Sequence, residues 1–93
     1  MRSLLIVGAD HLGDIPDKLT SAGFDNVFHI NGRKKQMVKK DIPEKVGCVL
    51  VLTDYVNHNL ASVIKKRAKS QSIPVYYAKR SWCSICKVLN VDS

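Results

Sequence analysis

The chain has 93 residues, of which 45% are hydrophobic and 25% are charged, and its formal net charge is +7. This composition is typical of a globular protein, and the length favours one domain over 1–93. Between Ser3 and Gly8 lie only four apolar residues, too few for a signal peptide or a membrane span. With an odd number of cysteines as well, these features predict a cytoplasmic protein with no membrane partner.

Four short apolar runs predict β-strands because they are rich in β-branched or aromatic residues and are followed by polar or glycine-containing segments. They are residues 4–7, 27–30, 46–52 and 74–78. The run over 46–52 is almost continuously apolar, as expected of a central parallel strand covered on both faces.

Helical patterns lie between these runs. Asp14 and Pro16 predict a helix start and Gly23 its end, while 33–40 predicts a short basic helix. From 57 to 71 the apolar residues fall on one face, with basic residues opposite. A last helix is predicted from about Ser81 onward through 89.

Strands that alternate with helices predict a three-layer α/β fold, with right-handed crossovers and a parallel sheet. We expect a Rossmann-like or flavodoxin-like domain with four strands in the order 2-1-3-4. In such sheets ligands bind beyond the carboxyl ends of the strands, where the strand order reverses. Four segments are predicted to meet there, and we call them the strand-end rim: residues 8–11, 31–33, 53–55 and 79–82.

Gly8 and Gly13 have the spacing that opens a phosphate-binding loop. However, Gly13 is followed by Asp14 rather than by lysine, and Asp10 and Asp14 would repel a phosphate. The dinucleotide fingerprint fails too, because position 10 is not glycine. The segment is therefore interpreted as a tight strand-to-helix turn, in which glycine permits unusual backbone angles.

The histidines carry more information. His11 and His58 follow the first and third strands and are predicted to flank one crevice, where either could ligate a metal. His29, within the second strand, is interpreted as a partly buried core residue. Asp54 could orient an imidazole or cap the following helix, and the sequence leaves both open.

Cys83 and Cys86 form a Cys-x-x-Cys pair at the start of the last helix. Such a pair can act as a redox dithiol, or it can be two small residues in a first helical turn. Lys87 follows instead of histidine, which excludes covalent c-type haem attachment.

Several stretches together resemble a bacterial family known as domain of unknown function 2325. These are LLIVGADHLGDIPDKL, HINGRK, VLVLTDYVNHNLA and VYYAKRSW, and the likeness covers essentially the whole chain. Its most specific part is the segment 53–59, which matches a Thr-Asp-x-Val-Ser/Asn-His-Asn motif, and the Cys83/Cys86 pair departs from the family pattern.

The resemblance implies a small Rossmann-like bacterial domain with no settled enzymatic activity, one that can hold haem in a homo-oligomer and bind oxygen. A histidine, His11 or His58, would then ligate iron, while aromatic side chains stack on the macrocycle and basic ones pair with propionates. The residues expected at the cofactor site are His11, His58, Asp10, Arg33, Thr53, Asp54, Tyr55, Lys79, Arg80 and Trp82.

Two other functions stay open beside this haem-binding module. The basic stretches 33–40 and 65–69 are either solvated helix faces or a surface for nucleic acid or an acidic partner. A nucleotide-responsive regulator or enzyme would instead use Asp10, His11, Asp54 and His58 of the strand-end rim. The absence of a phosphate loop and of a nucleophile motif favours a non-enzymatic protein.

Overall fold

The structure, a computed structural model, describes residues 3–30 and 46–90. In chain order its elements are β1 (Ser3–Val7), α1 (Ile15–Ser21), β2 (Asn26–Ile30), β3 (Cys48–Leu52), α2 (His58–Ser70), β4 (Val75–Ala78) and α3 (Trp82–Leu89). The basic helix predicted over 33–40, and the rim residues 31–33 with Arg33 among them, lie outside the described residues.

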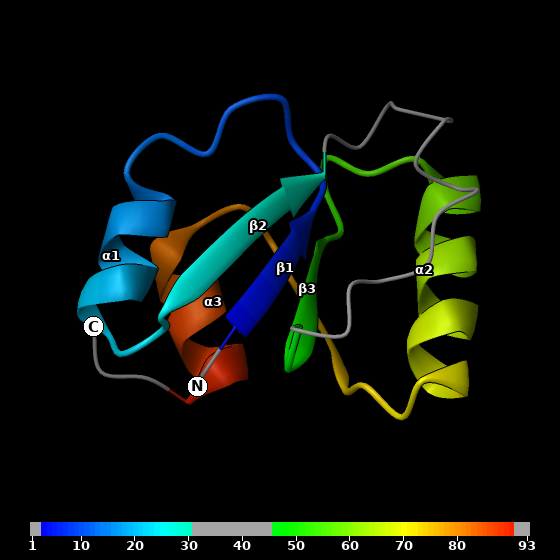
Figure 1. Cartoon of the computed structure of the whole chain (residues 1–93). Helices are drawn as coiled ribbons and strands as arrows, with labels where there is room; N and C mark the ends of the chain where they lie inside the picture. The colour runs from blue at the N-terminus through cyan, green and yellow to red at the C-terminus, as the bar shows by residue number, and fades with distance from the viewer. Residues whose placement is uncertain (1–2, 31–45, 91–93) are drawn as a thin grey trace.

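The four strands form one parallel sheet in the order β2-β1-β3-β4, which confirms the predicted order (Figure 1). In register, Ile6 pairs with His29 on β2, and Val7 pairs with Val51 on β3. The strand order reverses between β1 and β3, so the carboxyl ends of these two strands lie at the centre of the strand-end rim.

The two inner strands are apolar because both of their faces are covered. Every residue of β1 is buried, and so are the last four residues of β3. Removing such aliphatic side chains from water is the main favourable term in folding, at roughly 25 cal/mol per Å² of apolar surface. The edge strands β2 and β4 are more exposed.

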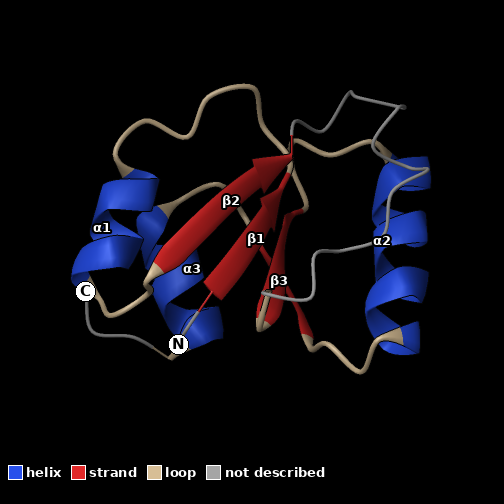
Figure 2. Cartoon of the chain, in the orientation of Figure 1, coloured by secondary structure: helices blue, strands red, loops and turns tan. Residues whose placement is uncertain are grey.

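Alternate residues of the inner strands point to opposite faces and build two cores. On one face Leu4, Ile6, Leu50 and Leu52 pack with α1 and α3, and on the other Leu5, Val7, Val49 and Val51 pack with α2. Figure 2 shows the resulting three layers, with the sheet between α1 and α3 on one side and α2 on the other. The three-layer α/β fold predicted from the sequence is confirmed.

The N-cap side chains of α2 and α3 accept hydrogen bonds from the first backbone N–H groups of these helices. The side chain of Asn57 accepts from the N–H groups of Asn59 at 2.8 Å and Leu60 at 3.4 Å, which starts α2. Asp14 precedes α1 but makes no side-chain cap hydrogen bond. Asp14 thus occupies the N-cap position, as the predicted helix start requires, but its carboxylate pairs with Lys18 at 3.7 Å.

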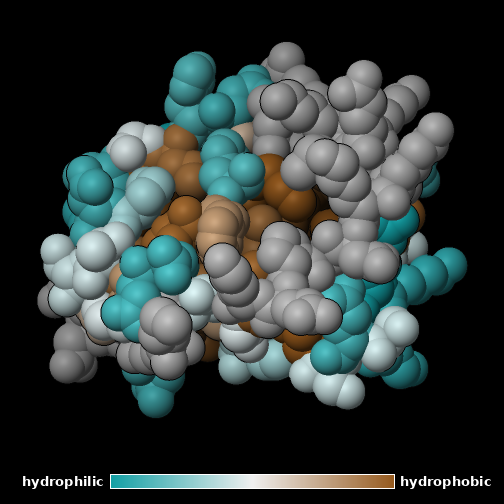
Figure 3. All heavy atoms as spheres, in the orientation of Figure 1, coloured by the Kyte–Doolittle hydropathy of each residue, from teal (hydrophilic) through white to brown (hydrophobic). Residues whose placement is uncertain are grey.

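The edge of the sheet at β2 leaves hydrophobic surface uncovered. Figure 3 shows hydrophobic atoms in the middle of this face, between hydrophilic side chains over α1 and α2. Phe28 on β2 is 37% exposed, and Tyr77 on the opposite edge strand, β4, is 44% exposed. Within residues 3–30 and 46–90, no helix has the length and apolar character needed to cross a membrane.

Candidate functional site

Three loops of the strand-end rim are joined by backbone hydrogen bonds. The N–H of Ala9, in the loop after β1, donates to the carbonyl oxygen of Tyr55, in the loop after β3, at 2.8 Å. The N–H of Thr53 donates to the carbonyl oxygen of Ala78, at the end of β4, at 2.9 Å. The backbone itself thus holds the loops after β1 and β3 against each other.

Gly8 is required by this close approach of the two loops. Its φ is +122°, and an added Cβ would lie 3.1 Å from the Cβ of Leu52 and 3.2 Å from the carbonyl oxygen of Tyr55. Gly13 also has a positive φ, +60°, but an added Cβ there would meet only the Nη2 atom of Arg80, at 3.9 Å. The glycines serve the turn geometry, as the sequence predicted.

Arg80 ties the loop after β4 to the other two loops. Its Nε–H donates to the carbonyl oxygen of His11 at 2.8 Å, and its backbone N–H donates to the Asp54 carboxylate at 3.0 Å. Neither role predicted for Asp54 is found, since Asn57 caps α2 and no hydrogen bond between Asp54 and an imidazole occurs among the described residues. Asp54 braces two loops of the rim instead.

His11 and His58 both present exposed imidazoles. His11 lies in the loop that leads from β1 to α1, and His58 is the first residue of α2. Their loops leave adjacent strands toward opposite faces of the sheet. Neither imidazole makes a hydrogen bond or ion pair within the described part of the chain, so both ring nitrogens are accessible to a ligand.

His29 has a structural role that differs from the predicted core position. It is exposed on the edge strand β2, and its Nε2 lies 2.9 Å from the carbonyl oxygens of both Gly8 and Ala9. Because carbonyl oxygens only accept hydrogen bonds, Nε2 carries the hydrogen and shares it between them. The imidazole therefore fixes the start of the loop after β1.

The other predicted residues lie around this centre. Tyr55 is 58% exposed, and Asp10 and Lys79 are exposed as well. Trp82, the first residue of α3, is half-buried against the core that includes Ile15 and Leu19 of α1, with the ammonium of Lys18 5.8 Å from its ring centroid. The hydroxyl of Thr53 donates to the carbonyl oxygen of Ala78 at 3.4 Å, so it serves the backbone.

The described residues hold no group of three or more His, Cys, Asp or Glu side chains that could bind a metal ion. A composite zinc site built from several histidines is therefore not found in this part of the chain. Haem needs fewer protein ligands than a zinc site, because the porphyrin already holds the iron and one histidine from the protein is enough.

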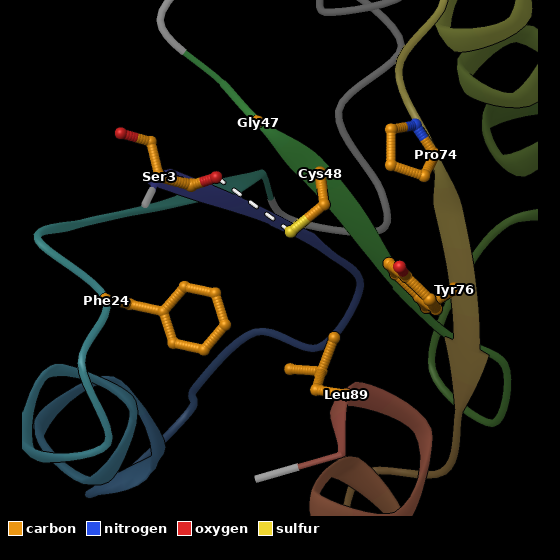
Figure 4. Close-up of a pocket in the computed structure, with 7 residues that line it drawn as sticks. All are labelled: Ser3, Phe24, Gly47, Cys48, Pro74, Tyr76 and Leu89. Atoms are coloured by element: carbon orange, nitrogen blue, oxygen red, sulfur yellow. Dashed lines mark hydrogen bonds between the residues drawn. The ribbon is translucent and has the colours of Figure 1, made fainter. Parts of the chain in front are cut away.

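Sequence reasoning missed a pocket at the opposite end of the sheet, near the amino ends of β1 and β3. Its volume is about 330 Å³, and Figure 4 shows its lining residues, Ser3, Phe24, Gly47, Cys48, Pro74, Tyr76 and Leu89. The thiol of Cys48 donates to the carbonyl oxygen of Ser3 at 3.9 Å. The lining comes from five separate segments, so no local pattern could reveal it.

A comparison with protein families places residues 3–91 in a family described as an uncharacterised protein conserved in bacteria, DUF2325. No curated protein and no solved structure matches the chain.

Proposed function

We propose that this chain, which belongs to the uncharacterised bacterial family DUF2325, is a small ligand-binding module that holds haem at its strand-end rim. Oxygen is the proposed ligand of the iron, and an oligomer of the chain is the proposed binding form. When bound, haem supplies an iron centre that takes up oxygen reversibly. The chain contributes the axial ligand, the partners of the propionates and the surface on which the macrocycle lies.

The observation that carries this proposal is the exposed His11, whose own carbonyl oxygen anchors the Arg80 guanidinium, together with a second exposed histidine, His58, at the start of α2. His11 lies in the loop after β1 and His58 is the first residue of α2, and either would supply an imidazole nitrogen to hold the haem iron. Arg80 is held by its Nε, and no hydrogen bond among the described residues uses its two terminal nitrogens. A planar guanidinium held in this way suits a carboxylate such as a propionate.

The shape of the rim determines how a haem would lie. Because the Ala9–Tyr55 hydrogen bond holds the loops after β1 and β3 together, the macrocycle would rest on the rim rather than enter between the loops. Tyr55 offers an exposed ring for stacking, whereas Trp82 is half-buried beside Lys18. One chain would leave much of an apolar porphyrin in water, so a second copy is needed to cover it.

An absorption spectrum of the chain purified with added haem tests the proposal. The expected result is a strong band near about 400 nm that shifts on reduction and again on exposure to oxygen. His11→Ala or His58→Ala is expected to abolish or shift the band. The third histidine is the control, and His29→Gln is expected to leave the band unchanged.

Two results would reject the haem proposal. One is a chain that stays colourless after haem addition. The other is a spectrum that neither His11→Ala nor His58→Ala alters. Sedimentation with and without haem then tests the oligomer, which is expected to form or tighten when haem is present.

The exposed face of α2 favours a second candidate, the binding of nucleic acid. Lys65, Lys66 and Lys69 are exposed, while Leu60, Ile64 and Ala68 of the same helix are buried against the sheet. Phosphate contacts release counterions, so such binding would weaken steeply as salt is added. A fluorescence titration with duplex DNA and with RNA at low salt tests this candidate. If neither nucleic acid binds at low salt, the candidate is rejected.

A further inference from the structure

Cys83 and Cys86 occupy two different environments within the first turns of α3. Cys83 is exposed, whereas Cys86 is only 7% exposed and packs in the protein interior beside the fully buried Ile85. Both are free thiols. A Cys-x-x-Cys pair at a helix start, with one thiol open to solvent and the other shielded, is the arrangement used in thiol–disulfide exchange.

The backbone allows the two sulfurs to join. Residues three apart on a helix have Cβ atoms about 5–6 Å apart, and a disulfide needs about 3.5–4.5 Å, so a small local shift is sufficient. Cys83 is the second residue of α3, and its N–H is one of the first-turn donors without a partner inside the helix. The Ser81 side chain caps the N–H of Ser84 at 3.2 Å, so this cap does not use the N–H of Cys83.

The charge around Cys83 indicates the kind of disulfide that would react. The first turn of α3 holds no acidic side chain, and the Lys18 ammonium over the ring of the neighbouring Trp82 is itself paired with Asp14 at 3.7 Å. Lys79 and Arg80 lie in the loop immediately before the helix. A small disulfide that carries carboxylates would be attracted to this surface, and its size would let it reach the one exposed thiol.

We propose that Cys83 and Cys86 form a thiol–disulfide exchange site for small anionic disulfides, a function separate from haem binding. The Cys83 thiolate attacks one sulfur of the substrate disulfide and forms a mixed disulfide, and the other substrate sulfur leaves as a thiolate. The Cys86 thiolate then attacks Cys83 Sγ and releases the second substrate thiolate. The chain is oxidised to the Cys83–Cys86 disulfide, and the substrate gains two electrons and two protons as two thiols.

The test exposes the reduced full chain to mixtures of reduced glutathione and glutathione disulfide, followed by alkylation and peptide mapping. The wild-type chain is expected to accumulate the Cys83–Cys86 disulfide, and Cys48→Ser is the matched control that should behave identically. Cys86→Ala is expected to stop at a mixed disulfide on Cys83, and Cys83→Ser to form neither product. Because Cys86 is buried, circular dichroism checks that Cys86→Ala still folds. If Cys86→Ala unfolds, the peptide maps of the wild-type chain and of Cys83→Ser are sufficient to test the proposal.

Three results would overturn the proposal. In the first, glutathione on Cys83 persists in the wild-type chain and is never displaced by Cys86. In the second, Cys48 is the main site of reaction. The third concerns charge, and it compares the rate of reaction with glutathione disulfide with the rate for the cationic disulfide cystamine, each divided by the rate of a free thiol with the same disulfide. The relative rate is expected to be severalfold higher for glutathione disulfide. Equal relative rates would show that the site has no preference for anionic disulfides. None of these measurements involves iron, so they are independent of the haem experiment.

Discussion

Arg80 donates its Nε–H to the carbonyl oxygen of His11 at 2.8 Å, although 69 positions separate the two residues in the chain. The same arginine receives its second anchor from Asp54, through its backbone N–H. One residue therefore holds the loops after β1, β3 and β4 in a fixed arrangement, and it does so beside an exposed imidazole on which the proposed function depends.

The first prediction concerns this arginine. Arg80→Ala removes the Nε hydrogen bond but keeps the backbone bond to Asp54, so the free energy of unfolding is expected to fall by about 1 kcal/mol. Arg80→Lys keeps the charge without the Nε donor and is expected to cost nearly as much, since geometry matters more than charge here. Urea denaturation measures both, and a Lys variant as stable as wild type would contradict the role given to Nε.

The second prediction compares two glycines of one loop. Gly8→Ala places a methyl group against Leu52 and the Tyr55 carbonyl at a φ of +122°, and is expected to cost about 2 kcal/mol. Gly13→Ala meets no close atom and carries only the strain of a φ of +60°, about 1 kcal/mol. Denaturation midpoints measure the difference, and the argument fails if Gly13→Ala is the more destabilising change.

The third prediction concerns the start of α2. Asn57→Ala leaves the N–H groups of Asn59 and Leu60 without their acceptor, and the free energy of unfolding is expected to fall by about 1 kcal/mol. Asn59→Ala is the matched control, because Asn59 lies within the helix, where alanine is the better helix former. Its stability should equal or exceed that of wild type, and equal losses from both variants would show that Asn57 is not the cap.

The fourth prediction concerns the proton on His29. Because Nε2 donates to the carbonyl oxygens of Gly8 and Ala9, the neutral imidazole is expected to be the Nε2–H tautomer, with the lone pair on Nδ1. Long-range ¹H–¹⁵N NMR spectra, recorded at a pH where the ring is neutral, distinguish the two tautomers directly. A protonated Nδ1 in the neutral ring would show that these hydrogen bonds do not form in solution.

The fold was accessible from the sequence because its signals are local. The apolar runs of β1 and β3 are almost uninterrupted, and the 3.6-residue spacing of Leu60, Ile64 and Ala68 identified α2. The strand order then followed from the alternation of strands and helices, and it is confirmed. Element boundaries differ by one or two residues, the usual uncertainty where helices and strands fray.

The site was less accessible because its contacts join distant segments. Asp54 precedes a helix, so capping was a reasonable expectation, but its partner Arg80 lies 26 positions away and is brought close only by the pairing of β3 with β4. His29 has apolar neighbours in sequence, which favoured a core position, and nothing local signals that its side chain reaches the carbonyl oxygens of the loop after β1. Exposure and loop contacts of this kind arise from tertiary structure.

The hydrogen bond between the Ala9 N–H and the Tyr55 carbonyl has a consequence for how this protein can diversify. Backbone atoms alone make that bond, so the side chains at positions 10, 11, 55 and 58 can be exchanged while the junction of the two loops is kept. Relatives with the same backbone can therefore carry different side chains on the same pair of joined loops. Variation at these four positions would then report a change of ligand, and variation at Gly8 would report a change of architecture.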